Sequence, residues 1–294
     1  MAMDDPAVCQ QRVTPDFIRS KKGRQKITFV TAYDFPTAKL ADENGFDMVL
    51  VGDTLAEVVL GHENTLPVTF ATMLHHTSAA RRAIEKALLV ADLPYGTYHA
   101  SEEDAVRFAV RFVKERGAQA VKLEGGRKRV NLIRRMLDAE IPVMGHIGLT
   151  PQSVHRMGGY KVQARLEVDI ERLLQDAVAL DEAGVFAMVL EGIPREVSKV
   201  VSEEVSAPTL GIGAGPDCQV LVLSDLLGLT FKRSAKFVRQ YFDVEAEIGS
   251  ALARFKADIE SGAYPTESEA YHLPGDLRLK LPEILQRIRG GANN

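Results

Sequence analysis

Four short apolar runs in this chain each end in a carboxylate residue, and this feature constrains the fold more than any other. The runs lead into Asp53, Asp92, Glu124 and Glu191. They are rich in valine and leucine, a composition typical of strands that are buried on both faces of a parallel sheet. In barrels built from such strands, the carboxyl ends of the strands form the active face. The sequence therefore predicts four carboxylates at one site.

A glycine precedes the acid in three of these runs by seven or eight residues. Gly45, Gly117 and Gly184 each follow a helix-like stretch. A helix, a left-handed glycine cap and then a strand form the αβ connection of α/β proteins. Helical patterns agree with this, with an apolar stripe over residues 166–184 and an approximate capping box that begins at Ser101.

Seven segments have the length and composition of strands. They are residues 27–31, 47–52, 87–92, 119–123, 142–147, 186–190 and 208–212. An eighth candidate lies at 219–223, but the short connection from 212 to 219 has no room for a crossover helix. The segment 219–229 is therefore open between strand and helix. Seven or eight strand and helix units favour a (β/α)8 TIM barrel, of the α/β class, over an open sheet.

The length of 294 residues is slightly above that of one α/β barrel with extensions. Because no linker divides the chain, we expect a single domain over 1–294. It would comprise an N-terminal extension (1–20), the barrel with C-terminal helices (21–262) and a tail (263–294). The pattern also predicts a helix that begins at Thr150-Pro151 and another over about 234–262, whereas the last dozen residues look frayed.

Composition excludes several classes of protein. The net charge of −4 gives no footprint for nucleic acid. Cys9, in a polar N-terminal tail, and Cys218 suggest neither a disulfide framework nor a CxxC metal site. No apolar run approaches the ~18 residues of a membrane span. The first residues are acidic and lack an apolar core, so we expect no signal peptide and a cytoplasmic location.

Asp53 and Asp92 follow neighbouring strands and should lie close together. Two adjacent carboxylates repel each other and require a proton or a cation. Oxygen ligands without cysteine clusters or spaced histidines favour Mg²⁺ over Zn²⁺. The alternative is that each aspartate only caps the helix after it.

Lys122 and Glu124 are two residues apart on one strand, so their side chains leave on the same face. A lysine in an apolar run is costly unless it faces a polar site, although a structural pair with a carboxylate is the alternative. Glu191 is either a general base, if apolar surroundings raise its pKa, or a solvated loop acid. His146, judged alone, is more often a core histidine than a ligand.

Seven motifs together resemble the ketopantoate hydroxymethyltransferase (3-methyl-2-oxobutanoate hydroxymethyltransferase) family. They are VGDTLAEVVLGHENTLPVT (51–69), LLVADLPYGTY (88–98), AVKLEGG (120–126), GHIGLTPQS (145–153), GGYKVQ (158–163), VLEGIP (189–194) and LGIGAG (210–215). The resemblance implies a barrel related to the phosphoenolpyruvate mutase and isocitrate lyase group. It also implies bound Mg²⁺, a homo-oligomer that is often a decamer, and the first step of pantothenate synthesis. In that step 5,10-methylenetetrahydrofolate gives a hydroxymethyl group to 3-methyl-2-oxobutanoate.

The resemblance implies a role for each of the residues singled out above. Asp53 and Asp92 match the family's Mg²⁺ ligands, which also contact the substrate, and Glu124 matches an acid that reaches the metal through water. Lys122 and His146 match groups that hold the keto acid, and Glu191 matches the presumed base. Thr54 stands where the family usually has a serine that binds the substrate carboxylate.

Two departures from the family pattern lie near these motifs. Ala56-Glu57 replaces a glycine followed by an apolar residue, which puts a charge near the site. Between Gly215 and Gln219 the chain is two residues shorter than the pattern, which bears on folate binding.

Two other functions remain open. One is a Mg²⁺-dependent C–C lyase or mutase of the same barrel group acting on a 2-oxo acid, although no KKCGH-type loop is present. The other is a non-catalytic barrel.

Overall fold

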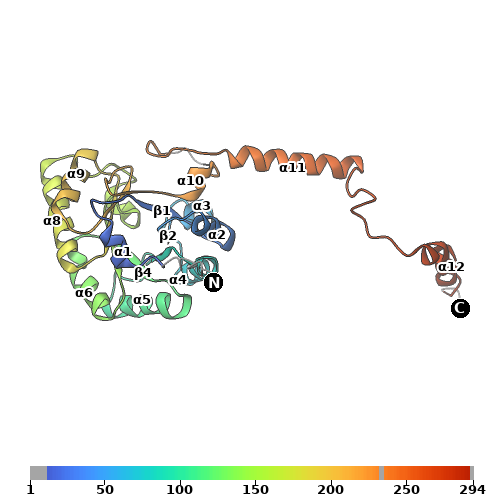
Figure 1. Cartoon of the computed structure of the whole chain (residues 1–294), viewed down its shortest axis with the longest axis horizontal. Helices are drawn as coiled ribbons and strands as arrows, with labels where there is room; N and C mark the ends of the chain where they lie inside the picture. Colours follow the sequence, from blue (N-terminus) through green and yellow to red (C-terminus); the bar gives the residue numbers. More distant parts are fainter. Residues whose placement is uncertain (1–11, 232–234, 292–294) are drawn as a thin grey trace, which may run out of the picture. The chain divides into compact units, whose positions relative to one another are not determined.

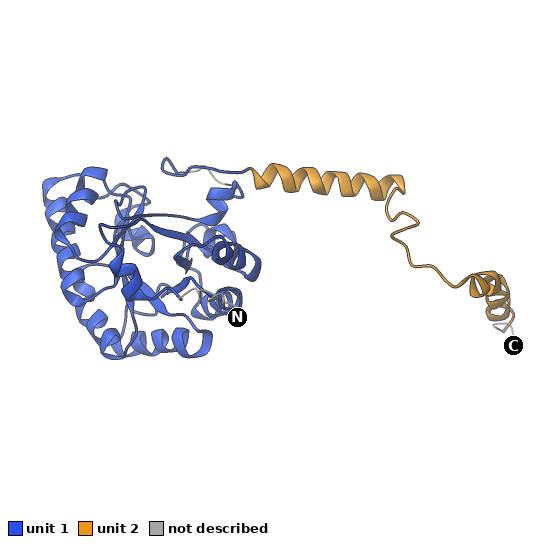
Figure 2. Ribbon diagram, in the orientation of Figure 1, with its two compact units in different colours: residues 1–242 blue, residues 243–294 orange. Residues whose placement is uncertain are grey.

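The computed structural model describes residues 12–231 and 235–291, so Cys9 lies outside the described residues. By internal contacts the chain divides into one unit of residues 1–242 and a second of residues 243–294 (Figure 2). The expected single domain over 1–294 stays a prediction. Among the described helices, none combines the length and the apolar character that crossing a membrane requires.

The first unit contains a closed barrel of eight parallel strands, with β1 paired to both β2 and β8 (Figure 1). The strands are β1 (Ile27–Thr31), β2 (Met48–Val51), β3 (Leu88–Asp92), β4 (Ala120–Glu124), β5 (Val143–Gly148), β6 (Ala187–Glu191), β7 (Thr209–Ile212) and β8 (Cys218–Leu221). The predicted (β/α)8 barrel is confirmed, and the predicted strands agree with these bounds to within one or two residues.

Six longer helices accompany the strands in chain order, with shorter helical turns between them. The longer ones are α2 (Phe35–Glu43), α4 (Phe70–Arg81), α5 (Glu102–Arg116), α6 (Val130–Asp138), α8 (Glu167–Ala183) and α9 (Arg195–Glu204). The short ones are α1 (Pro15–Ser20), α3 (Leu55–Val58), η1 (Arg127–Arg129), η2 (Pro151–Ser153), α7 (Val154–Met157) and α10 (Leu223–Leu227). The second unit consists of α11 (Val244–Ser261) and α12 (Gly275–Gly291).

The predicted caps explain where two of these helices end. Gly117 and Gly184 follow α5 and α8 in the left-handed conformation, with φ of 68° and 98°. At the other end of α5, the hydroxyl of Ser101 accepts a hydrogen bond from the Asp104 N–H at 3.2 Å. Local sequence thus turns the chain from helix to strand and directs each strand towards the same end of the barrel.

The barrel interior is filled by alternate residues of the strands, as the pleat requires. One apolar cluster gathers such residues from all eight strands, among them Met48 and Leu50 of β2, whereas Val49 and Val51 belong to the cluster that packs against the helices. The same alternation continues along β4, where Ala120 belongs to the interior cluster. Polar residues therefore follow the apolar layers at the carboxyl ends of the inward rows.

The open segment 219–229 contains both elements that its sequence allowed. β8 ends at Leu221 and α10 begins at Leu223. The preceding connection folds back on β7 so closely that a Cβ on Gly211 would lie 1.0 Å from the Ala214 carbonyl oxygen. Glycine at 211 is thus required by the chain's own backbone, not by a ligand.

Three expectations about helices were wrong in part. Thr150-Pro151 begins only a 3₁₀ turn and the short α7, which ends at Met157 and is followed by a left-handed Gly158. The helix expected over about 234–262 starts later, at Val244, where the Asp243 side chain caps it. The last dozen residues, expected to be frayed, include the second half of α12 up to Gly291, and residues 292–294 lie outside the described residues.

Candidate active site

A cavity of about 540 Å³ opens at the carboxyl ends of the barrel strands. Its lining includes all seven residues singled out in the sequence, namely Asp53, Thr54, Asp92, Lys122, Glu124, His146 and Glu191. Strands β3 to β6 end in or carry five of these residues, and Asp53 and Thr54 follow β2. The barrel therefore brings together groups that are up to about 140 residues apart in the chain. Their individual roles stay predictions.

Asp53 and Asp92 are adjacent, as the pairing of β2 with β3 requires. The Asp53 N–H donates a hydrogen bond to Asp92 Oδ2 at 3.0 Å. Both residues are buried, at 4 % and 3 % exposure. Burial, together with the charge of Asp92, raises the pKa of Asp53 to about 7. This pair thus holds more negative charge than its surroundings stabilise.

Lys122 is the cation that partly compensates this charge. Its ammonium lies 2.9 Å from Asp92 Oδ1. Burial alone would lower the pKa of Lys122, but the carboxylates, Asp92 first, outweigh burial and hold the pKa above its usual value. The structural pair that the sequence left as an alternative is therefore present, and the same ammonium also lines the cavity.

His146 stands between two acids. Its Nε2 lies 3.1 Å from Glu191 Oε2, and its Nδ1 lies 3.6 Å from Glu124 Oε1. Burial, and then the charge of Lys122, lowers the pKa of His146 well below its usual value. The imidazole is therefore neutral at pH 7, so these contacts join a neutral ring to the acids.

Burial also controls the two glutamates of this row. It raises the pKa of Glu191 to about 7, against an opposing effect of Lys122. It raises the pKa of Glu124 well above its usual value, with the charge of Asp53 acting in the same direction. Glu191 keeps 15 % of its side chain exposed, so it faces the open cavity and is poised to exchange a proton near neutral pH.

Gln152 organises the acids and is absent from the residues predicted from sequence. Its Nε2 donates to Asp53 Oδ2 at 2.8 Å, and its backbone N–H donates to Glu124 Oε2 at 3.1 Å. Its own Oε1 accepts from the Tyr98 hydroxyl at 2.5 Å. Gln152 and Tyr98 both lie in motifs quoted above, and this was the only feature of the sequence that could have identified them. An amide and a phenol in a loop do not by themselves indicate such contacts.

Glu57, the first departure from the family pattern, also lines the cavity. Its Oε1 accepts a hydrogen bond from the Tyr160 hydroxyl at 2.7 Å. This bond ties α3 to the segment between α7 and α8, which carries the GGYKVQ motif. The substituted residue is therefore part of the cavity wall.

The donor set fits a hard cation. One lysine lines this cavity together with six carboxylates, those of Asp53, Glu57, Asp92, Glu124, Glu191 and Asp225, and the candidate metal ligands are all oxygens. Among the described residues, no group of three or more His, Cys, Asp or Glu side chains is arranged to hold a metal ion. Mg²⁺ commonly binds one or two carboxylates and completes its shell with water and substrate oxygens, so Asp53 and Asp92 suffice.

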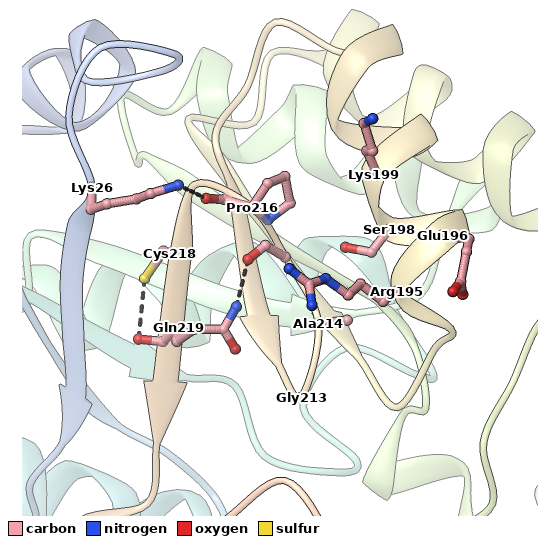
Figure 3. A pocket seen from close by; sticks show the side chains of 11 residues that line it. Lys26, Arg195, Glu196, Ser198, Lys199, Gly213, Ala214, Pro216, Cys218 and Gln219 are labelled. Carbon is pink, nitrogen blue, oxygen red and sulfur yellow. Dashed lines mark hydrogen bonds between the residues drawn. The ribbon is translucent and has the colours of Figure 1, made fainter.

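The shortened connection between β7 and β8 lies at a different cavity, of about 920 Å³, formed with α9 on the barrel wall. Figure 3 shows Pro216, Cys218 and Gln219 beside Arg195 and Lys199 of α9. Residues 213–217 do not line the cavity that holds the carboxylates. This connection therefore belongs to the barrel wall and not to the cavity that holds the predicted site residues.

Comparison with known proteins gives a consistent result. A family model described as ketopantoate hydroxymethyltransferase matches residues 11–267. A protein of Koribacter versatilis named 3-methyl-2-oxobutanoate hydroxymethyltransferase is 56% identical over 281 residues, which cover 95% of this chain and 95% of that protein. A protein of the same name from Syntrophomonas wolfei is 50% identical over 280 residues, covering 94% and 99%.

Solved structures share the fold at low identity. Phosphonopyruvate hydrolase in complex with oxalate and Mg²⁺ has a TM-score of 0.56 and 12% identity, over 94% of this chain and 98% of that one. The 2,3-dimethylmalate lyase, a member of the PEP mutase/isocitrate lyase superfamily, has a TM-score of 0.52 and 16% identity, over 95% and 98%. At such identities the likeness concerns the fold alone.

Proposed function

This chain belongs to the ketopantoate hydroxymethyltransferase family, and from that premise we propose the reaction it catalyses. It transfers a hydroxymethyl group from 5,10-methylenetetrahydrofolate to 3-methyl-2-oxobutanoate and so produces 2-dehydropantoate (ketopantoate). The chain is then a one-carbon transferase that acts at the first step of pantothenate synthesis. The observation that carries the proposal is the convergence of all seven predicted residues on one cavity at the active face of the barrel.

Glu191 is the base in this proposal. The reaction begins with removal of the proton on C3 of the keto acid, which needs an acceptor whose pKa lies near the working pH. Burial raises the pKa of Glu191 to about 7, and its side chain faces the cavity. The proton moves to a carboxylate oxygen of Glu191, and the carbon then attacks the one-carbon unit of the folate. Water supplies the hydroxyl oxygen, and tetrahydrofolate leaves.

Lys122, His146 and Thr54 hold the keto acid. The ammonium of Lys122 supplies a positive charge for the substrate carboxylate or keto oxygen. His146 is neutral, so one ring nitrogen donates and the other accepts. Its Nδ1 lies 3.4 Å from the Lys122 ammonium and accepts, and its Nε2–H donates to Glu191 or to the keto acid without adding charge. The hydroxyl of Thr54 lines the same cavity and replaces that of a serine with one added methyl group.

Asp53 and Asp92 would hold the Mg²⁺, with Glu124 reaching it through water. When bound, the ion supplies positive charge that stabilises the negative charge developing on the keto oxygen. Asp53 and Asp92, with Asp53 held by Gln152, would fix the position of the ion relative to Glu191.

Proton exchange provides the direct test. With Mg²⁺ and 3-methyl-2-oxobutanoate in D₂O, and without folate, proton NMR should show loss of the C3 proton signal. Adding methylenetetrahydrofolate should then give ketopantoate. A matched control is 3,3-dimethyl-2-oxobutanoate, which has no C3 proton and should give neither result. Absence of exchange with bound substrate and Mg²⁺ would favour the non-catalytic barrel, and cleavage of a 2-oxo acid would favour the lyase.

Two further expectations accompany this function. We propose a homo-oligomer, a decamer by the family resemblance, which sedimentation equilibrium tests by mass. We also propose a cytoplasmic location, where keto acid and folate are both available to the enzyme; fractionation of cells tests it.

A further inference from the structure

A second cavity, of about 580 Å³, opens beside the one that holds the carboxylates. It is lined by the segment after β4, by the end of β5 and by the first turns of α8. Glu124 contributes to the lining of both cavities. The segment between β5 and α8 separates them, because Pro151 and Tyr160 line the first cavity whereas Thr150 and Arg156 line the second.

The second cavity is basic in a protein of net charge −4. Its five cations are Arg127, Lys128, Arg129, Arg156 and Arg172, and its three acids are Glu124, Asp169 and Asp176. Two of the acids are already paired. Arg127 Nε lies 3.0 Å from Asp176, and Arg172 Nη1 lies 3.5 Å from Asp169.

Lys128, Arg129 and Arg156 are not neutralised by these acids. Among the described residues, none of the three forms an ion pair with a carboxylate at 4 Å or less. The Arg129 guanidinium instead donates to the Tyr98 carbonyl oxygen at 2.9 Å and lies 4.7 Å from the centroid of the Tyr98 ring, so no carboxylate neutralises its charge. Three cations from two separate segments thus surround one opening.

Lys128 and Arg129 lie where a cation opposes the local helix dipole. The basic turn η1 leads directly into α6, whose first turn contains no acid and whose N-cap side chain makes no capping hydrogen bond. Cations at a helix N-terminus are unfavourable, and an anion there is stabilised. Burial, and then the charges of Arg129 and Arg156, lowers the pKa of Lys128, in agreement with a positive local field.

We propose that this basic cavity binds the carboxylates of the glutamate tail of the folate co-substrate. The inference rests on the proposed function, since the one-carbon end of the folate must then reach the first cavity. The other end of that molecule carries carboxylates, which lysine and arginine recognise by charge-assisted hydrogen bonds. The first cavity holds the carboxylates of Asp53, Asp92, Glu124 and Glu191 with one lysine, so its negative charge disfavours the tail there. The charges of the two cavities therefore orient the folate.

Binding affinity tests the proposal without turnover. Isothermal titration calorimetry measures the dissociation constants of tetrahydropteroate, tetrahydrofolate and tetrahydropteroyl triglutamate, which carry zero, one and three glutamates. We expect the triglutamate to bind wild-type protein about tenfold more tightly than tetrahydropteroate, as expected for a few partly exposed charge pairs. In the double variant Lys128→Gln/Arg156→Gln this preference should disappear, while the affinity for tetrahydropteroate is kept, which also shows that the variant is folded.

Lys199→Gln is the matched control, because Lys199 is an exposed lysine that lines the barrel-wall cavity instead. It should retain the preference for the triglutamate. Raising the salt concentration should weaken the preference in wild type and in the control.

The other outcomes overturn the inference. If the three compounds bind wild-type protein equally, or if the double variant keeps the preference for the triglutamate, the glutamate tail does not bind in this cavity. Inorganic phosphate is titrated alone as the other source of anionic oxygens. A phosphate site that is lost in the double variant, with no glutamate preference in wild type, would assign the cavity to free phosphate. The proton-exchange assay distinguishes failure of this inference from failure of the proposed function. If wild-type protein exchanges the C3 proton but shows no preference for glutamate, the proposed function stands and this inference is wrong.

Discussion

Both ends of the barrel bury aspartates, but the surroundings shift the pKa of these aspartates in opposite directions. At the amino ends, Asp217 accepts hydrogen bonds from Lys22, Ser202 and Thr209 at 2.9 to 3.0 Å. Burial alone would raise the pKa of Asp217, but the Thr209 N–H and the Lys22 ammonium outweigh it and lower the pKa. At the carboxyl ends, Asp53 has a pKa raised to about 7 by burial and by Asp92.

The number of donors explains the difference. Asp42, also at the amino ends, accepts three backbone N–H groups, from Glu85, Lys86 and Ala87. At the carboxyl ends the carboxylates of Asp53, Asp92, Glu124 and Glu191 share one lysine and the side-chain amide of Gln152. Acids with enough donors stabilise the fold. Acids with too few donors readily bind a cation or a proton, and this property is needed at the end of the barrel where catalysis takes place.

Of the variants that test this difference between the two ends, Glu191→Gln should have the largest effect on activity. Glutamine has nearly the same size but accepts no proton at neutral pH, so exchange of the C3 proton should fall by about 10² to 10⁴-fold. Stability should change little, and substrate should still bind. Proton NMR in D₂O measures the exchange, with Glu196→Gln, an exposed acid on α9, as the control. Exchange at the wild-type rate in Glu191→Gln would exclude this residue as the base.

Asp217→Asn tests the stabilising end. It leaves the Lys22 ammonium without its carboxylate and the Thr209 donors with a weaker acceptor, so the free energy of unfolding should fall by about 3 kcal/mol. Urea denaturation monitored by circular dichroism measures this loss. Proton exchange per folded molecule should stay at the wild-type rate. A stable variant with slow exchange would contradict the division between the two ends.

Asp53→Asn tests the opposite expectation at the carboxyl end. Removing one of two adjacent buried charges should raise the free energy of unfolding without Mg²⁺ by about 2 kcal/mol. The same change should abolish the rise in Tm that Mg²⁺ gives the wild type, because a metal ligand is lost. Differential scanning calorimetry with and without Mg²⁺ measures both effects. Unchanged Mg²⁺ stabilisation in both Asp53→Asn and Asp92→Asn would exclude these residues as ligands.

The pH dependence of C3 proton exchange tests whether the pKa of Glu191 is raised as described. Glu191 accepts a proton only when ionised, and its pKa is raised to about 7. The exchange rate at saturating substrate should therefore rise about tenfold between pH 6 and pH 8 and level off above. A rate that is flat over this range would mean that the base has an ordinary carboxylate pKa.

Tyr160→Phe should have the smallest effect. It removes only the hydrogen bond to Glu57, worth about 0.5 to 1.5 kcal/mol, and leaves the carboxylates in place. As a positioning residue, Tyr160 should affect the KM for the folate by about threefold and leave folate-independent exchange unchanged. Tyr241→Phe, a change at an exposed tyrosine, is the control. A loss of exchange in Tyr160→Phe would place Tyr160 in the chemistry itself.

The sequence predicted most of the barrel because the relevant signals are local. Buried strands appear as apolar runs, and glycines such as Gly117 and Gly184 mark the turns from helix to strand. The convergence of Asp53, Asp92, Glu124 and Glu191 followed from the rule that parallel strands end together.

The remaining features depend on contacts between distant segments. Gln152 donates to Asp53, 99 residues away, and no pattern around Gln152 indicates this. The tight turn at Gly211 is required by the backbone at Ala214, so the glycines there carried no information about a ligand. α12 ends in Gly290 and Gly291, and glycine is unfavourable inside a helix, so the local pattern predicts a frayed end where the structure has a helix.

The pairing of β1 with β8 has a consequence for synthesis on the ribosome. Ile27 is paired with Cys218, which is translated about 190 residues later. At roughly 5 to 20 residues per second, β1 waits about 10 to 40 s for its second partner. During that interval its hydrogen-bonding edge is open to strands of other chains. Slower translation therefore lengthens the time for which the nascent barrel is exposed to pairing with other chains, whatever the stability of the finished fold.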